Sequence, residues 1–166
     1  AFVLSTTRSK ARITGITTGK IVDYGVKDSM NMGAAMAPAA CDVIYHHLLD
    51  FERKPEDYDK IITGDLGKVG KEILIKLLRE KGIDIAEIHT DCGIEIFDCE
   101  EQGTQSGGSG CGCSAVTLSA YFLKQVEKGA LKRILFVPTG ALLSTVSFNE
   151  GQSVPGIAHA IVIEHA

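Results

Sequence analysis

The clearest secondary structure lies in residues 60–81, KIITGDLGKVGKEILIKLLREK, where a short strand passes directly into a helix. Residues 60–63 are largely apolar and β-branched, as is typical of a buried strand. From residue 67 to residue 81 the apolar side chains recur at helical spacing, and Gly82 follows where a helix commonly ends. The apolar stripe of this helix consists of Val69, Ile73, Leu74, Leu77 and Leu78. A strand joined to a helix in this way favours an α/β protein.

The remaining segments extend this alternation of strands and helices. Apolar and β-branched runs predict strands at residues 11–22, 133–137 and 156–164, an edge strand at 83–88, and a strand or extended turn at 142–147. Helical patterns predict helices at residues 113–127 and 38–51, the latter with Pro38 in its first turn. Residues 91–112 carry no regular pattern. The order of these elements predicts an α/β fold with a central mixed sheet and packed helices.

The composition excludes several classes of protein. The chain has 166 residues, 45% of them hydrophobic and 23% charged, which is typical of one folded domain and not of a disordered or fibrous chain. A net charge of -4 disfavours nucleic acid and anionic lipid as main partners. The apolar runs are too short and interrupted to cross a bilayer. The five cysteines, an odd number, favour free thiols in a reducing compartment.

Residues 103–112, GTQSGGSGCG, hold five glycines in ten positions and lead into the helix predicted at 113–127. Glycine lets the backbone approach a ligand closely, and the amides at the start of a helix attract anions. One interpretation is a cradle for an anion, built on Gly107, Gly108 and Ser109; the other is a tight turn where a helix packs on the sheet. The tract lacks the Gly-Lys-Ser/Thr of a P-loop and the setting of a dinucleotide fingerprint, so we expect neither a nucleotide nor another cofactor.

Cys111 and Cys113 flank Gly112 at the start of that helix. A helix N-terminus lowers the pKa of a thiol, so either cysteine is a candidate nucleophile. A zinc site would also need Cys92 and Cys99, whose spacing is not that of a zinc knuckle. The third alternative is that these are small buried residues, the common fate of cysteine, and no metal site is predicted.

Two further positions allow both a structural and a functional interpretation. Asp65, in the turn Gly64-Asp65-Leu66-Gly67, is either the cap of the following helix or part of a ligand site at the carboxyl edge of the sheet. His159 lies in the last predicted strand, either as a core residue with a satisfied hydrogen bond or as a ligand contact. His46 and His47 are expected at a solvated helix end.

Several segments together resemble known proteins. Met32-Gly33, Ala37-Pro38-Ala39 and Asp57-Tyr58-Asp59, followed by Gly64-Asp65, occur in the order found in the second half of the thiolase-like fold. Three segments are more specific and resemble the family of stage V sporulation protein AD, thiolase-like proteins of spore-forming Firmicutes. They are residues 107–115, GGSGCGCSA, residues 138–144, PTGALLS, and residues 155–160, PGIAHA. The resemblance covers nearly the whole chain.

The resemblance implies one half of a pseudo-twofold fold. Residues 1–166 correspond to the C-terminal thiolase-like half, and Ala1-Phe2-Val3-Leu4 reads as the end of a buried strand. We therefore expect that the N-terminal half, which carries the nucleophilic cysteine of thiolases, is absent from this chain.

The resemblance also implies that a fold is kept and a reaction is lost. Thiolases have Asn-Glu where this chain has Gly64-Asp65, and a Gly-His-Pro near Gly107-Gly108. Their late cysteine falls near residues 153–155, where this chain has none, and the His and Asn of ketoacyl synthases fall near residues 63–64 and Cys111. Without a general base, an acyl-transfer enzyme of this kind can neither form the carbanion nor return the proton.

The sporulation family is understood to bind dipicolinic acid, pyridine-2,6-dicarboxylate, for its uptake into the forespore. The resemblance implies a non-catalytic protein that binds this dianion, alone or as its calcium complex with Asp65 at the metal. The implied partners are the N-terminal half of the same fold, the other proteins of the dipicolinate uptake channel, and further copies in a homo-oligomer. The implied location is peripheral, at the inner membrane of the forespore. Family members carry a His before the glycine tract, where this chain has Gln105.

The helices that start near residues 67 and 113 are expected to face one crevice at the carboxyl edge of the sheet. The residues expected to bind ligand there are Asp65, Leu66, Gly67, Gly107, Gly108, Ser109, Cys111 and His159. One alternative is an acyl-transfer or condensing enzyme that uses Cys111 or Cys113 as its nucleophile. Another is a structural subunit of a transport complex whose pocket is vestigial.

Overall fold

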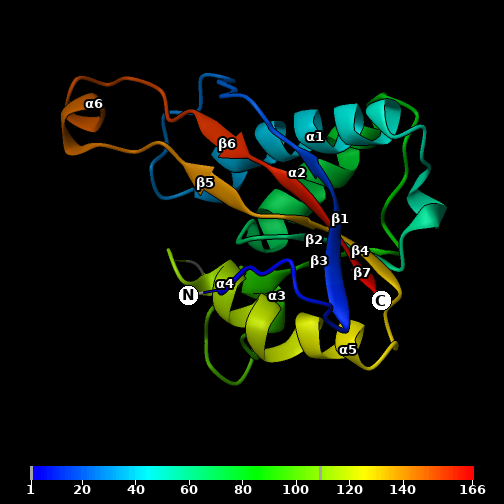
Figure 1. Ribbon diagram of the computed structural model, residues 1–166. Helices are drawn as coiled ribbons and strands as arrows, with labels where there is room; N and C mark the ends of the chain where they lie inside the picture. The colour runs from blue at the N-terminus through cyan, green and yellow to red at the C-terminus, as the bar shows by residue number, and fades with distance from the viewer. Residues whose placement is uncertain (1, 109) are drawn as a thin grey trace.

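The central strands place alternate side chains in two different cores. β2 (Lys60–Thr63) sends Ile61 into one core and Ile62 into the other, and β4 (Arg133–Val137) alternates in the same way. In the computed structural model, which describes residues 2–108 and 110–166, this alternation produces three layers, with helices on both faces of one sheet (Figure 1). The α/β fold with a central mixed sheet, predicted from the sequence, is confirmed.

The sheet has five strands in the order β1-β7-β4-β2-β3, with β1 at Ala11–Thr17, β3 at His89–Asp91 and β7 at Ala160–His165. β2, β3 and β4 run parallel, whereas β7 is antiparallel to its neighbours β4 and β1. Thr63 pairs with both Asp91 and Val137, so β2, β3 and β4 end side by side. Ligands commonly bind at this carboxyl edge of an open α/β sheet.

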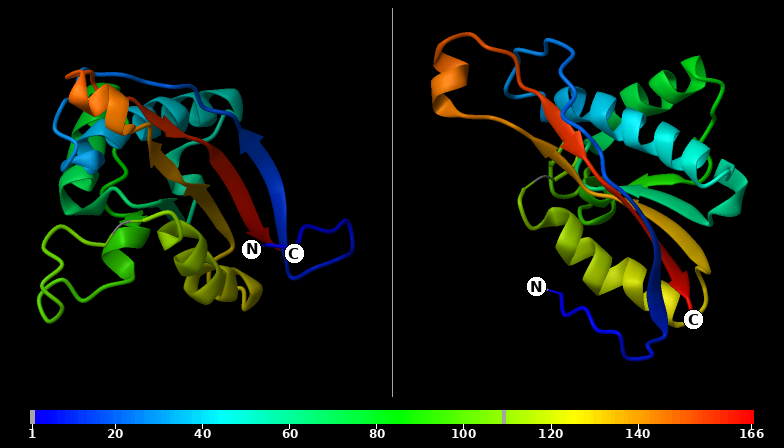
Figure 2. Two further views of the ribbon diagram at one scale, coloured as in Figure 1. Left: turned by 90° about the vertical axis from the view of Figure 1, so that its left-hand side faces the viewer. Right: turned by 45° about the horizontal axis from the view of Figure 1, so that its top comes forward.

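Helices cover both faces of the sheet. α1 (Met32–Asp50) and α2 (Gly67–Glu80) pack on one face. The other face carries a continuous helical segment: α4 (Cys113–Thr117), the π-helical turn η2 (Leu118–Phe122) and α5 (Leu123–Glu127) (Figures 1 and 2). Two short helices, η1 (Pro55–Asp57) and α3 (Cys92–Glu95), lie in the connections. None of the helices in the described ranges has both the length and the apolar character needed to cross a bilayer.

β4 and β7 continue outward as a two-stranded arm. β5 (Thr139–Ala141) pairs antiparallel with β6 (Gly156–Ala158), and α6 (Thr145–Asn149) lies between them at the tip of the arm. The tip of the arm projects from the three layers in Figure 1 and in the right-hand view of Figure 2. Its tip exposes the apolar side chains of Leu142, Leu143, Val146 and Phe148.

The predicted edge strand at residues 83–88, and residues 142–147, predicted as a strand or an extended turn, form no strand in the structure. The segment predicted as an edge strand at residues 83–88 contains a turn at residues 86–88, in which the amide of Ile88 donates to the carbonyl of Ile85 at 3.1 Å, and the strand starts only at His89. Within residues 142–147, the Ser144 side chain accepts a hydrogen bond from the amide of Ser147 at 3.0 Å and thereby caps α6. Each segment keeps one backbone hydrogen bond to a distant residue, from the amide of Ile61 to the carbonyl of Ile88 and from the amide of Leu142 to the carbonyl of Pro155, and otherwise uses short-range hydrogen bonds.

Three predicted boundaries also differ. The first strand ends at Thr17, and the last is divided into β6 and β7 at His159. α1 begins at Met32, because the side chain of Asn31 accepts from the amide of Ala34 at 3.3 Å and caps it there. Pro38 therefore lies inside the helix, where its missing N–H costs one intrahelical hydrogen bond. Residues 2–4 are exposed and form no strand, and Ala1 lies outside the described residues.

Candidate functional site

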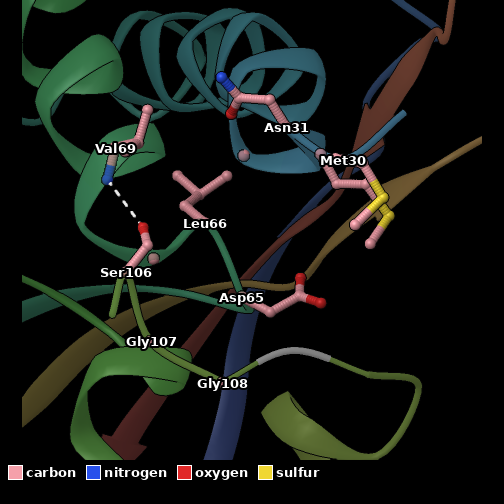
Figure 3. Close-up of a pocket in the computed structure, with 11 residues that line it drawn as sticks. Met30, Asn31, Asp65, Leu66, Val69, Ser106, Gly107 and Gly108 are labelled. Carbon is pink, nitrogen blue, oxygen red and sulfur yellow. Dashed lines mark hydrogen bonds between the residues drawn. The ribbon is translucent and has the colours of Figure 1, made fainter. Parts of the chain in front are cut away.

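A cavity of about 360 Å³ opens at the carboxyl edge of the sheet, where β2 passes into α2. Three segments that are distant in sequence surround it (Figure 3). They are the start of α1, the start of α2 and the glycine tract, and the lining residues are 30–33, 65–67, 69 and 106–108.

The cavity brings together five of the eight residues that were expected to bind ligand: Asp65, Leu66, Gly67, Gly107 and Gly108. Cys111 is exposed and does not line it. His159 is also exposed and outside the cavity lining, and its Nδ1 atom accepts a hydrogen bond from the amide of Gly19 at 3.1 Å. Ser109 lies outside the described residues.

The cap of α2 is Asp91, not Asp65. Asp91 follows β3 and is completely buried; its Oδ2 accepts from the amide of Leu66 at 2.9 Å and its Oδ1 from the amide of Gly67 at 2.9 Å. The N-cap position itself is held by Leu66, whose side chain cannot accept a hydrogen bond. The interpretation of Asp65 as a helix cap was therefore wrong. The residue that caps the helix lies 26 positions later in the chain, too far away for a local sequence pattern to reveal it.

Ser106 accepts hydrogen bonds from the next two amides of α2. Its carbonyl accepts from the amide of Lys68 at 2.6 Å, and its hydroxyl accepts from the amide of Val69 at 3.3 Å (Figure 3). The backbone approaches this closely because Gly67 has a φ of +63°, and a Cβ there would lie 2.6 Å from the Ser106 carbonyl oxygen. The first amides of α2 thus already have acceptors within the protein and are not available to an external anion.

The second helix that starts at the cavity is α1, not α4. Asn31, Met32 and Gly33 line the cavity, whereas no residue of α4 does so. The side chain of Asn31 accepts a hydrogen bond from the amide of Ala34 only. The amides of the first helical residues, Met32 and Gly33, have no acceptor inside the helix. Sequence analysis missed this start; the signal was Asn31 immediately before an apolar run.

Asp65 is the one ionisable side chain among the residues that line the cavity. Thr139, at the start of β5, holds it: the Thr139 hydroxyl donates to Asp65 Oδ1 at 3.0 Å, and the Asp65 amide lies 3.3 Å from the same hydroxyl. The amide of Gly110 lies 3.5 Å from Oδ2. The cavity therefore presents a fixed negative charge, with no lysine or arginine in its lining.

Packing explains part of the glycine tract. The amide of Gly108 donates to the carbonyl of Gly93 at 2.8 Å, and a Cβ on Gly93 would collide with the Gly108 carbonyl. A Cβ on Gly108 would collide with the ring of Phe97. The tight-turn interpretation thus accounts for Gly93 and Gly108, while Gly107 and Gly108 also form a wall of the cavity.

Two of the thiols near the site, those of Cys113 and Cys92, are buried. Cys113 lies at the start of α4, but its Sγ is buried, 3.7 Å from the carbonyl oxygen of Gly64. Burial, and then the carboxylates of Asp65 and Asp91, raise the pKa of Cys113, which opposes the effect expected of a helix N-terminus. Burial raises the pKa of Cys92 strongly as well. In the described part of the chain no three His, Cys, Asp or Glu side chains form a cluster that could hold a metal ion.

The architecture is that of thiolase-like proteins. Over 95% of its length the chain superposes on 56% of the crystal structure of Xanthomonas campestris OleA H285A, with a TM-score of 0.52 at 10% identity. Over 97% of its length it superposes on 51% of AbyA1, a tetronic acid condensing enzyme, with a TM-score of 0.50 at 12% identity. At such low identity these likenesses define the fold alone.

Sequence comparison places the chain within one family of that fold. Residues 1–164 match the family Stage V sporulation protein AD (SpoVAD). The chain is 44% identical to Stage V sporulation protein AD of Bacillus subtilis (strain 168) over all of its 166 residues, which cover 49% of that protein. The chain belongs to the SpoVAD family of sporulation proteins, and it spans about half the length of the curated relative that it matches.

Proposed function

We propose that this chain is the C-terminal half of a non-catalytic thiolase-like sporulation protein that binds dipicolinic acid as its calcium complex. The observation that carries the proposal is the cavity at the carboxyl edge of the sheet, with Asp65 as its one ionisable lining residue. Its volume of about 360 Å³ lies within the range of small-ligand sites, and a planar ring with two carboxylates is a small ligand.

The charge of the cavity favours the calcium complex over the bare dianion. A free dicarboxylate would be repelled by Asp65, and Asp91 and Ser106 already occupy the amides of α2. Calcium dipicolinate is neutral, and its metal takes six to eight oxygen ligands, so a coordination position remains for a carboxylate of the protein. The amides of Met32 and Gly33 at the start of α1 can then meet a carboxylate of the ligand.

Calcium would arrive with its chelator. The described residues contain no cluster of three acidic, His or Cys side chains, so a bare ion would find too few ligands. Dipicolinate supplies oxygens from both carboxylates and leaves Asp65 as the single protein carboxylate to be added. Asp65 is thus the only protein carboxylate that the bound complex requires.

The buried thiols support the absence of catalysis. Acyl transfer through cysteine needs a thiolate, and burial raises the pKa of both Cys92 and Cys113. The exposed Cys111 does not line the cavity. We therefore expect that the full-length protein does not speed the release of coenzyme A from acetyl-CoA or acetoacetyl-CoA above the rate in buffer alone. Turnover that is lost in Cys111→Ser or Cys113→Ser would favour the acyl-transfer alternative.

The proposal includes the partners of the complete protein. Because the chain spans about half of its relative, the N-terminal half of the same fold is the first partner. The others are the remaining proteins of the dipicolinate uptake channel at the inner membrane of the forespore, and further copies in a homo-oligomer. Membership of the SpoVAD family supports this assignment, and the acidic net charge disfavours nucleic acid.

Isothermal titration calorimetry tests the proposal. The full-length protein that contains this chain is titrated with disodium dipicolinate, with calcium chloride, and with both, and the 166-residue piece is titrated in parallel. The full-length protein should bind the calcium complex more tightly than dipicolinate alone, and the piece should bind weakly or not at all. Absence of binding by the full-length protein under all three conditions would overturn the proposal.

Asp65→Asn isolates the metal contact. The amide side chain of this variant keeps an oxygen for the Thr139 hydroxyl, so the melting temperature should change little. Affinity for the calcium complex should fall about tenfold or more, to that for dipicolinate alone, because a charged ligand of the metal is lost. The exposed Glu87 provides the control Glu87→Gln, which should bind as the wild type does. If Asp65→Asn bound the calcium complex normally, Asp65 would have no contact with the metal.

A further inference from the structure

We propose that Asp91 is the positioning residue of the cavity, and that its carboxylate holds two of the three cavity walls relative to each other. This inference rests on the proposed function of the cavity. Asp91 does not line the cavity itself, and it is completely buried at the end of β3. Its role therefore depends on what its two oxygens bind.

The first wall, residues 65–67, is bound directly. Asp91 accepts hydrogen bonds from the amide of Leu66 at Oδ2 and from the amide of Gly67 at Oδ1, each at 2.9 Å. These contacts fix the turn between β2 and α2, and they fill the start of α2 with a carboxylate of the protein. An external anion therefore cannot bind the first amides of α2. In this way Asp91 also disfavours binding of a free anion in the cavity.

The second wall, residues 106–108, is bound through one intermediate. Asp91 Oδ1 accepts from the amide of Gly93 at 3.0 Å, and the carbonyl of Gly93 accepts from the amide of Gly108 at 2.8 Å. Gly93 and Gly108 lie so close that a Cβ on Gly93 would collide with the Gly108 carbonyl. One carboxylate thus joins the α2 turn, the α3 turn and the glycine tract.

A buried chain of side chains orients Asp91. The hydroxyl of Thr63 donates to Asp91 Oδ2 at 2.6 Å, so it can only accept from His89, whose Nε2 lies 3.0 Å away. His89 is therefore protonated at Nε2, and its buried Nδ1 has no partner among the described residues. A buried carboxylate with four hydrogen bonds fixes geometry that an apolar side chain could not.

Hydrogen–deuterium exchange and calorimetry on the full-length protein test this assignment. The variants are Asp91→Asn, Asp91→Ala and Thr63→Val. The matched control is Asp98→Asn, because Asp98 also accepts two backbone amides, those of Glu100 and Glu101, but in an exposed turn. Asp91→Asn should speed exchange in peptides that cover residues 64–70 and also in those that cover residues 104–108. It should lower affinity for calcium dipicolinate about tenfold or more, whereas Asp98→Asn should do neither.

The two regions distinguish positioning from simple capping. If Asp91→Asn speeds exchange at residues 64–70 but not at 104–108, Asp91 is only the cap of α2 and the inference is wrong. Unchanged affinity despite faster exchange in both regions would also overturn it. If Asp91→Ala does not fold, Thr63→Val, which removes one of the four hydrogen bonds, should give smaller changes of the same kind. Faster exchange in both regions of a protein whose wild type binds no dipicolinate would uphold the positioning role and reject the proposed function.

Discussion

The Nε2 atom of His47, near the end of α1, lies 2.6 Å from the hydroxyl oxygen of Tyr58 inside the core. Its Nδ1 atom lies 2.7 Å from the hydroxyl of Thr17 on β1, so both ring nitrogens have partners. His47 has no exposed surface, and its expected position at a solvated helix end was wrong. Burial, and then the charge of Arg53, lower the pKa of His47 to about 4. The neutral imidazole is therefore part of the folded core.

This pKa predicts a loss of stability in mild acid. The unfolded histidine takes up a proton below about pH 6.5, whereas folded His47 does so only near pH 4. The stabilising contribution is therefore complete above about pH 6.5 and is lost as the pH falls towards 4, by up to about 3 kcal/mol. Urea unfolding at a series of pH values measures this. His47→Gln should make the profile less steep between these limits, leaving the part due to buried His89, whose pKa burial lowers to about 3. The exposed His46→Gln should leave the profile unchanged. Identical profiles for His47→Gln and the wild type would contradict the prediction.

Gly67→Ala and Gly82→Ala form a matched pair for the start of α2. Both glycines have positive φ, +63° and +78°, but a Cβ on Gly67 would meet the Ser106 carbonyl while a Cβ on Gly82 would meet nothing within 4 Å. Gly82→Ala should lower the free energy of unfolding by about 1 kcal/mol through backbone strain alone. Gly67→Ala should cost at least about 1 kcal/mol more, since it also displaces Ser106. If both variants lost the same free energy of unfolding in urea, Ser106 would be able to move away from the new Cβ without an energetic cost.

Alkylation of the native protein should distinguish the thiols. Cys111 is exposed, whereas Cys41, Cys92 and Cys113 are buried, and burial raises the pKa of each of these three. Iodoacetamide followed by peptide mass spectrometry should show modification at Cys111 and protection at the three buried cysteines until urea is added. Rapid and selective modification of Cys113 would instead indicate an activated nucleophile.

Glu52→Gly should stabilise the end of α1. Glu52 has a φ of 51°, in the left-handed region, just after the helix ends, and the amide of Arg53 donates to the carbonyl of Leu48 at 2.9 Å to close the turn. Glycine adopts this conformation without strain, so we expect a gain of up to about 1 kcal/mol in the free energy of unfolding. Glu52→Ala, which keeps the strain, should show no such gain in thermal or urea unfolding.

The elements that could be predicted from the sequence are those with a strong local period. β2, β4 and α2 lie at or within one residue of the predicted bounds, because their apolar side chains alternate or recur at helical spacing. Residues 83–88 contain three isoleucines and so suggested a strand, but Ile85 is buried from within a turn. The start of α1 is rich in small residues, which give no amphipathic stripe from which its first turn could be located.

The part of the candidate site that could be predicted is the part with a local sequence signal. The turn at Asp65 and the glycine tract stand out locally, and both line the cavity. The role of Asp91 could not be predicted, because it depends on the parallel pairing of β2 with β3, which brings Asp91 next to Thr63. Tertiary contact, rather than local pattern, decides which carboxylate caps α2 and which one faces the cavity.

The arm formed by β5 and β6 has a consequence for how related sequences can vary. Thr139, which holds Asp65, pairs with Ala158 at the base of the arm, and a shift of one residue in this pairing would turn Thr139 to the opposite face. Insertions between Leu143 and Gln152 lengthen only the tip, because Ser153 and Val154 are already bonded to Asp23 and Val26. An insertion or deletion between Val137 and Thr139 separates the arm from Asp65. Relatives of this chain are therefore expected to differ in length at the tip of the arm and to agree in length at its base.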